Sequence, residues 1–327
     1  MRCSVENKAD STIAETLTNL WQRVLQKKII RYEDNFFELG GDAASATELF
    51  REIAQVCGQE WPPAMIYAAP TIQLQESLLL QSAQVRFPRA VLLKPGSGRL
   101  PVFVAHGMGG SVLEFFDLTR CISTPHPIYG IQARGTDGLE EPLNRIEDMA
   151  RFHVEAIREV QPHGPYYLIG HSLGGLIMLE VARWLRASGE NVALLSLVDA
   201  YPAMRYLKLG SRVRLIVQLA TRRASTMMNQ SIRANYGKQL APTMQRVLGA
   251  SFVALKEYRP HFYQGEIKFV RAAITTVFPD DPAAVWSKLA KKVEVETSAG
   301  DHHGMLATEF ASLAAVLSRY LSGAPSS

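Results

Sequence analysis

One short segment, Gly170-His-Ser-Leu-Gly174, constrains the fold of this 327-residue chain more than any other. The apolar run Tyr166–Gly170 predicts a strand before the serine, and residues 173–188 have the periodicity of an amphipathic helix after it. A serine between small residues at such a turn is held clear of the backbone, and the helix N-terminus stabilises negative charge beside it. We therefore predict a nucleophile at Ser172. Charged residues mark the expected exposed face of the helix: Glu180, Arg183 and Arg186.

Short apolar runs typical of strands recur along the rest of this part of the chain. They are Pro101–His106, Ile128–Ala133, Ala193–Asp199, Glu266–Ala272 and Val293–Thr297. Helical patterns separate the strands up to Asp199, as in βαβ units that build a parallel sheet with helices on both faces. The fold class is therefore predicted to be α/β.

A serine hydroxyl needs a base, and the chain has eight histidines. In a fold of this kind the base follows the last strand, where Asp301-His-His-Gly-Met305 stands, so His302 or His303 is expected. His171 is expected to lie beside the serine. The remaining histidines are interpreted as ordinary surface, turn or packing residues: His106, His126, His153, His163 and His261.

The base needs a carboxylate that orients its imidazole. Asp199 ends the strand that follows the helix at residues 173–188. It lies at the same edge of the sheet as Ser172 and is the favoured candidate. Asp280 and Asp281 follow a later strand and compete for the role, although turn positions explain them more simply. With Asp199, the chain order of serine, aspartate and histidine is that of α/β-hydrolases.

An oxyanion hole needs two backbone N–H groups aimed at the developing negative oxygen. Leu173, directly after the nucleophile, is expected to provide one. The other is expected from the glycine-rich loop His106-Gly-Met-Gly-Gly110 after the first buried strand, with Met108 as donor. The alternative for Met108 is a side chain that only fills the core.

The N-terminal part of the chain has a helical pattern of about 80 residues, small but sufficient for an independent fold. Helices are expected at residues 12–25, 43–56, between Pro62-Pro63 and Pro70, and at 71–84. Thr12 and Glu15 have capping-box spacing, and Gly58 lies where a C-cap belongs. We predict a four-helix domain at residues 1–84, a linker at 85–89 and the large domain at 90–327.

Composition excludes several other classes of protein. The three cysteines lie far apart without metal-ligand spacing, so reduced thiols, no metal and a cytoplasmic location are expected. The polar N-terminus does not resemble a secretory signal, and no run of about 18 apolar residues predicts a membrane span. A net charge of +4 gives little support for nucleic-acid binding.

Residues from about 90 to 327 resemble the type I thioesterase domains that end nonribosomal peptide and polyketide synthases. The matching segments are His106–Gly110, Tyr129–Gly135, Gln161–Tyr167, Gly170–Gly175 and Gly300–His302. The resemblance implies an α/β-hydrolase fold with a helical lid at about 201–262. It places the base on His302, with Met305 closing the motif, and the acid on Asp199.

Residues 1–84 resemble the carrier domain that precedes such thioesterases, and Phe36-Phe-Glu-Leu-Gly-Gly-Asp42 matches its attachment motif. The family has a serine next, which carries 4′-phosphopantetheine, whereas this chain has Ala43. Ser45 is two residues too late to replace it. No cofactor is therefore expected on this chain. A serine at position 43 would be expected to receive the group from a phosphopantetheinyl transferase. Either the carrier is naturally inactive or the serine has been replaced.

The resemblance implies a chain-releasing enzyme. An acyl or peptidyl chain, assembled by upstream synthase modules, arrives as a carrier thioester, passes to Ser172 and leaves by hydrolysis or cyclisation. Two other functions stay open at this point: a free-standing esterase with a helical appendage, and a docking module with an inactive carrier.

The expected lid is basic, and at about 60 residues it is long enough to be functional. Between Tyr201 and Ala250 it has no acidic residue. Its basic residues are Arg205, Lys208, Arg212, Arg214, Arg222, Arg223, Arg233, Lys238 and Arg246. The charges either balance acids elsewhere or guide an anionic group, such as the phosphate of the carrier arm, an acidic carrier surface or an acidic product. Contact of a basic helix with a membrane is a weaker third interpretation.

Overall fold

The computed structural model describes residues 12–81, 87–202, 242–274 and 281–323. By its internal contacts the chain divides into two compact units, Met1–Val91 and Leu92–Ser327, which are described separately below. Much of the expected lid, residues 203–241, lies outside the described residues, and so do all of the basic residues named between Tyr201 and Ala250 except Arg246. Because residues 82–86 also lie outside them, the linker at 85–89 stays a prediction.

The first unit consists of short helices. They are α1 (Ile13–Leu25), α2 (Ala43–Cys57), the 3₁₀ turn η1 (Pro63–Tyr67) and α3 (Ile72–Leu80). The predicted capping box of α1 forms, since Thr12 Oγ1 accepts the Glu15 N–H and the Glu15 carboxylate accepts the Thr12 N–H. Gly58 ends α2 in the left-handed conformation, with φ of 69°. Both ends therefore follow from local sequence signals.

The core of this unit is aromatic. Trp21 of α1 packs edge-on against Phe36, with ring centroids 5.2 Å apart, and both side chains are fully buried. The Trp21 indole N–H donates to Gln75 of α3 at 3.0 Å, and the Gln75 amide donates to the Ala69 carbonyl at 3.0 Å. The buried Gln75 side chain thus has a partner for its oxygen and for its nitrogen, as burial requires.

The second unit is built on a seven-stranded sheet with the order β1-β3-β2-β4-β5-β6-β7. The strands are β1 (Ala90–Lys94), β2 (Val102–Ala105), β3 (Ile128–Ile131), β4 (Tyr166–His171), β5 (Val192–Val198), β6 (Tyr263–Ala272) and β7 (Ala290–Ser298). Neighbours from β3 through β7 in this order pair in parallel. The six predicted strands correspond to β2 through β7.

Strand β1 was not predicted. It lies at the edge of the sheet, where Val91 is 3% exposed and the next residue, Leu92, is 45% exposed. Its residues Ala90–Leu93 form a continuous apolar run, so the sequence carried a strand signal that the prediction did not use.

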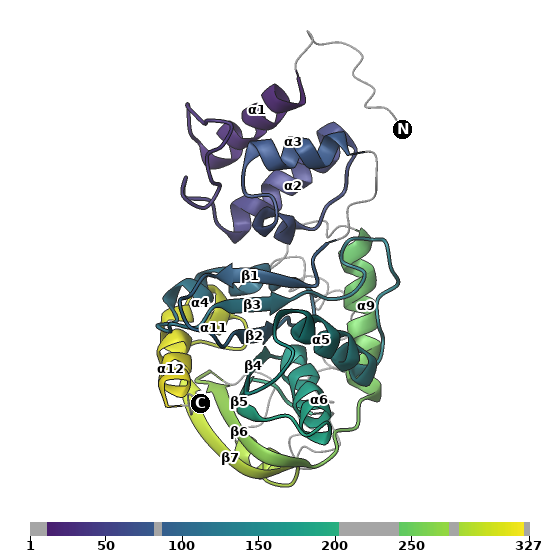
Figure 1. The fold of residues 1–327 in the computed structure, drawn as a ribbon, viewed down its shortest axis with the longest axis vertical. Coiled ribbons are helices and arrows are strands. Elements are labelled where there is room, and N and C mark those ends of the chain that lie inside the picture. The colour runs from purple at the N-terminus through teal and green to yellow at the C-terminus, as the bar shows by residue number, and fades with distance from the viewer. Residues whose placement is uncertain (1–11, 82–86, 203–241, 275–280, 324–327) are drawn as a thin grey trace. The chain divides into compact units, whose positions relative to one another are not determined.

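Helices cover both faces of the sheet (Figure 1). On one face lie α5 (Ile146–Val160) and α6 (Leu173–Ala187), which pack against each other. On the other lie α4 (Phe116–Cys121), α11 (Gly304–Ala307) and α12 (Phe310–Ser322). The turn η2 (Val112–Phe115) precedes α4, α9 (Pro242–Glu257) follows β5, and α10 (Pro282–Trp286) follows β6. No helix among the described residues is long and apolar enough to cross a membrane.

Glu180 corrects the expected exposed face of α6. It is 2% exposed and not solvated: Tyr258, just after α9, donates its hydroxyl to Glu180 at 2.7 Å, and Arg183 donates at 2.6 Å. The helical period alone placed Glu180 with Arg183 and Arg186, because it could not show that the segment after α9 covers this position.

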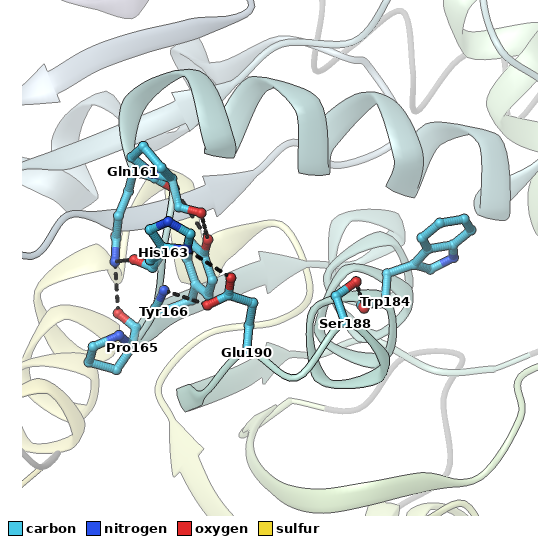
Figure 2. A network of polar contacts seen from close by, with 9 residues as sticks. Gln161, His163, Pro165, Tyr166, Trp184, Ser188 and Glu190 are labelled. Atoms are coloured by element: carbon cyan, nitrogen blue, oxygen red, sulfur yellow. Dashed lines mark hydrogen bonds and ion pairs between the residues drawn. The ribbon is translucent and has the colours of Figure 1, made fainter.

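A polar network holds the turn that leads into β4 (Figure 2). Gln161 donates its side-chain amide to the carbonyls of His163 and Pro165, at 2.7 and 3.0 Å. Glu190, from the turn between α6 and β5, accepts the Gly164 N–H at 2.9 Å and contacts the His163 ring at 3.1 Å. These contacts fix the start of the strand whose far end carries Ser172.

Candidate active site

Ser172 stands on the expected strand-to-helix turn. It follows β4, precedes α6 and has φ of 56°, which is rare for a residue with a side chain. Its neighbours must be small, since a Cβ on Gly170 would lie 2.2 Å from the Gly174 carbonyl oxygen. The Ser172 N–H donates to the Val198 carbonyl at 2.9 Å, which holds the turn against β5. The backbone thus presents the hydroxyl at the carboxyl edge of the sheet.

The structure brings Ser172, His302 and Asp199 into one line of hydrogen bonds. His302 Nε2 lies 3.0 Å from Ser172 Oγ, and His302 Nδ1 lies 2.7 Å from Asp199 Oδ2. With the proton on Nδ1 donated to the carboxylate, Nε2 is free to accept the serine proton. This is the arrangement of a nucleophile, its base and the acid that orients the base.

Asp199 is held firmly at the end of β5. It is 3% exposed, its φ is 45°, and its N–H donates to the Val270 carbonyl at 2.7 Å. Its second carboxylate oxygen accepts the Ala272 N–H at 3.2 Å. One oxygen is therefore occupied by β6 and the other by the imidazole, so the side chain has little freedom to turn away.

The competing residues occupy other positions. His303 is exposed, and its backbone N–H donates to Asp301 at 3.1 Å, while its ring lies edge-on to that of His302. Asp281 is the N-cap of α10 and accepts the Ala284 N–H at 3.0 Å. Asp280 lies outside the described residues. Neither His303 nor Asp281 contributes to the hydrogen-bonded line.

His171 lies beside the serine, as expected, and supports the loop of the base. It is 4% exposed, its ring lies 4.7 Å from that of His302, and its Nε2 donates to the His302 carbonyl at 3.0 Å. Burial holds the pKa of His171 well below its ordinary value, with the nearby His302 adding to the effect. The ring therefore stays neutral and keeps the tautomer that donates from Nε2.

The two expected oxyanion donors lie on either side of the elbow. Leu173 is the first residue of α6, where a backbone N–H has no helical acceptor. Met108 is half-buried in the loop after β2. Within the part of the chain that the structure describes, neither N–H donates to a protein acceptor. Both groups are thus available to a ligand oxygen.

The sequence pattern indicates neither the position of Glu114 nor that of His106. The Glu114 carboxylate accepts the Gly107 N–H, and His106 Nδ1 donates to the Gly107 carbonyl at 2.7 Å. Burial raises the pKa of Glu114 to about 7 and lowers the pKa of His106 to about 4. The available signal was a single acid inside the apolar run Val112-Leu-Glu-Phe-Phe116, directly after the glycine-rich loop.

His106 packs against a second buried histidine, His153 of α5, with ring centroids 5.4 Å apart. His153 Nδ1 donates to the Met149 carbonyl at 2.8 Å, and burial, with the nearby His106, lowers the pKa of His153 to about 3. A cavity of about 10 Å³ adjoins both rings and Ser251 of α9. Both histidines are buried, at 1% exposure each, so neither is a surface residue.

The predicted position of carrier attachment, residue 43, lies at the N-terminus of α2. Ala43 is the first helical residue, after the N-cap Asp42. The Ser45 hydroxyl is engaged in the cap, since Oγ donates to Asp42 Oδ1 at 2.6 Å and accepts the Asp42 N–H at 2.8 Å. Ala43 has no oxygen and Ser45 is committed to the backbone, so these residues do not fit covalent attachment of 4′-phosphopantetheine.

Comparison with known proteins gives the family. The model of the thioesterase domain matches residues 100–320. The chain belongs to the thioesterase domain family. A second model, the phosphopantetheine attachment site, matches residues 15–78. The motif-based prediction of a carrier followed by a thioesterase is thereby confirmed, and the chain has the domain pair of nonribosomal peptide synthetase proteins.

Relatives and solved structures agree with this assignment. The dimodular nonribosomal peptide synthase of Bacillus subtilis (strain 168) is 38% identical over 189 residues, which is 58% of this chain and 8% of that protein. A four-domain nonribosomal peptide synthetase structure, bound to AMP and glycine, covers 98% of this thioesterase chain with a TM-score of 0.63 and 22% identity; 27% of that chain is matched.

A covalent complex of the NocB thioesterase domain with a fluorophosphonate nocardicin G analog covers 72% of this chain and all of its own, with a TM-score of 0.57 and 21% identity. At such identity the likeness shows the fold. The predicted α/β-hydrolase fold preceded by carrier helices is confirmed.

Proposed function

We propose that this thioesterase releases an acyl or peptidyl chain from a carrier thioester by way of Ser172. One observation carries the proposal: the line of hydrogen bonds from Ser172 through His302 to Asp199, with distances of 3.0 and 2.7 Å. The family supports thioester chemistry, and the preceding carrier region, matched at residues 15–78, supports a substrate delivered by upstream synthase modules.

In the first step Ser172 Oγ attacks the thioester carbonyl while His302 Nε2 takes the hydroxyl proton. The carbonyl oxygen becomes an oxyanion, which the N–H groups of Leu173 and Met108 stabilise. As the C–S bond breaks, the imidazolium returns its proton to the departing sulfur. The products are an acyl ester on Ser172 and a free thiol, and no other reactant is needed.

In the second step His302 removes a proton from a nucleophile that attacks the ester. Water gives a free acid, and a hydroxyl or amine within the bound chain gives a ring. In either case the proton passes to Ser172 Oγ as the ester bond breaks, and the enzyme is restored. Asp199 accepts the hydrogen bond from His302 Nδ1–H throughout and stabilises the imidazolium in both steps.

Two other functions make different demands on the molecule. A free-standing esterase would use the same triad without reference to the first unit, and would turn over simple oxoesters as well as carrier thioesters. A docking module would need neither step. The capped attachment motif around Ala43 favours the carrier-linked thioesterase over the first alternative, and the aligned triad favours it over the second.

The test is capture of the acyl-enzyme. The chain is mixed with an acyl N-acetylcysteamine thioester and quenched, and its intact mass is measured. We expect a gain of one acyl group on the unaltered chain, mapped to the Ser172 peptide, and no gain on Ser172→Ala. Circular dichroism checks that the variant folds. Equal acylation of Ser172→Ala, or faster turnover of the matched oxoester than of the thioester, would refute the proposal.

A further inference from the structure

The loop that carries Met108 is held from both sides at one residue, Gly107. The Glu114 carboxylate, from η2, accepts the Gly107 N–H, and the His106 imidazole donates from Nδ1 to the Gly107 carbonyl at 2.7 Å. The Gly110 N–H also donates to that carbonyl, at 3.3 Å. Both polar groups of Gly107 are thus fixed by groups within the same short segment.

The geometry of the peptide unit connects this anchoring to the oxyanion hole. The Gly107 carbonyl and the Met108 N–H belong to one planar trans peptide, so they point in opposite directions. Holding the carbonyl on His106 therefore aims the Met108 N–H away from His106. Holding the Gly107 N–H on Glu114 fixes the preceding peptide, which leaves the loop little freedom to rotate.

The two anchors are themselves positioned by packing. His106 is 1% exposed and lies against His153. The Glu114 carboxylate lies close to the loop backbone, because a Cβ built on Gly107 would be 3.3 Å from both Glu114 oxygens. The same Cβ would be 3.6 Å from His171 Nδ1, and His171 in turn donates to the His302 carbonyl at 3.0 Å. Glu114 thus lies close to Gly107, at the point where the loop that carries Met108 approaches His171.

We propose that Glu114 is a positioning residue for the oxyanion hole, acting with His106 to fix the Gly107 peptide units so that the Met108 N–H points at the reacting carbonyl oxygen. This inference rests on the proposed function. Glu114 is partly buried, and Val112, Leu113, Phe115 and Phe116 around it are buried apolar residues, so packing alone does not favour an acid at this position. A buried carboxyl group costs stability unless it is engaged.

The kinetic test compares two replacements of similar size. Glu114→Gln keeps an oxygen that accepts the Gly107 N–H, whereas Glu114→Met does not. Loss of an oxyanion donor costs about 10²–10³ in kcat, so a misdirected donor in Glu114→Met is expected to lower kcat at least about tenfold. We expect KM to change less than about threefold and Glu114→Gln to restore most of kcat. A Glu114→Met chain with normal kcat would overturn the inference.

Leu118→Ala provides the matched control. Leu118 lies in α4, four residues after Glu114, and is 1% exposed, so its truncation destabilises the same segment by loss of packing. It removes neither anchor of Gly107. We expect a lower melting temperature with a kcat close to that of the unaltered chain. An equal fall of kcat in Leu118→Ala and Glu114→Met would mean that Glu114 acts only through stability, which also overturns the inference.

A second readout does not depend on turnover. In nuclear magnetic resonance spectra the Gly107 amide proton is expected to be shifted downfield by its bond to a carboxylate, to move in Glu114→Gln and to lose that shift in Glu114→Met. An unchanged Gly107 resonance in Glu114→Met would overturn the inference. Should the unaltered chain fail to turn over thioesters, the proposed function would fall, and the rate of fluorophosphonate labelling of Ser172, which uses the same N–H groups, would then decide the role of Glu114.

Discussion

Two helix N-termini in this chain have sequence motifs predicted to bind a group covalently, and they differ in whether the key residue has a hydroxyl group. At α6 the residue before the helix is Ser172, with φ of 56° and a hydroxyl 3.0 Å from an imidazole. At α2 the corresponding acceptor position is Ala43, the first helical residue after the capping Asp42. Both motifs keep their glycines, but only α2 has a side-chain cap, from Asp42. The comparison teaches that α2 and its cap form with an alanine at the predicted attachment position, so this local fold does not need the serine hydroxyl.

The largest expected effect is all-or-none and concerns the missing hydroxyl at Ala43. Incubated with coenzyme A and a phosphopantetheinyl transferase, the unaltered chain is expected to gain no mass, because Ala43 lacks an oxygen and the Ser45 hydroxyl is held by Asp42. Ala43→Ser is expected to gain one phosphopantetheine group, measured by intact mass spectrometry. Modification of the unaltered chain would show that the Ser45 hydroxyl leaves the cap. Both helix N-termini would then offer a reactive serine hydroxyl.

The next largest effect tests His302, the predicted base, which lies 3.0 Å from Ser172 at the α6 site. Loss of a general base costs about 10²–10⁴ in rate, and more where the residues act as a unit. His302→Ala is therefore expected to lose nearly all turnover of an acyl-thioester mimic. His303→Ala, the matched control one residue away, is expected to lose far less. A dead His303→Ala with an active His302→Ala would displace the motif by one residue.

The acid that orients the base has its own pair of variants. Asp199→Asn is expected to lower turnover severely, because an amide nitrogen facing His302 Nδ1 favours the wrong tautomer. Asp281→Asn is expected to be mild, since Asp281 caps α10 and an asparagine caps as well. Steady-state rates with the same thioester decide between them. An active Asp199→Asn together with a dead Asp281→Asn would place the acid after β6.

The smallest expected effect is on the pH dependence of the melting temperature. It contrasts Glu114, near Ser172, with Asp42, next to Ala43. Burial raises the pKa of Glu114 to about 7, so between about pH 4.5 and 7 the folded chain holds this proton more tightly than the unfolded chain. Stability therefore falls as pH rises through that window. Glu114→Gln does not titrate, and its melting temperature is expected to gain a few degrees on that of the unaltered chain between pH 5 and 8.

Asp42 provides the opposite case. Burial acts to raise its pKa, but hydrogen bonds from Ser45 and neighbouring backbone groups outweigh it and hold the pKa below its ordinary value of 3.8. The stability that this contributes is present above that value and is lost only in stronger acid. The difference in melting temperature between Asp42→Asn and the unaltered chain is therefore expected to stay level from pH 5 to 8. The contrast between the two acids would be contradicted if the difference for Asp42→Asn changed with pH in this range. It would also be contradicted if the difference for Glu114→Gln did not.

Many features of this protein can be predicted from short stretches of its sequence. The elbow around Ser172, the caps of α1 and α2, the central strands and the missing hydroxyl at Ala43 all depend on residues within a few positions of one another. Propensity, period and steric limits act over that range, so the sequence by itself predicts them. The family resemblance added a preference for His302 over its neighbour.

Contacts between distant segments decided the rest. The bonds that join His302 to Ser172 and to Asp199 span 130 and 103 positions. Glu180 is buried by Tyr258, 78 positions away, and no helical period carries that information. Glu114 is only seven positions from Gly107, yet its role depends on the loop turning back over η2. Tertiary structure was needed in each case, because burial and hydrogen-bond partners depend on which surfaces meet in the fold.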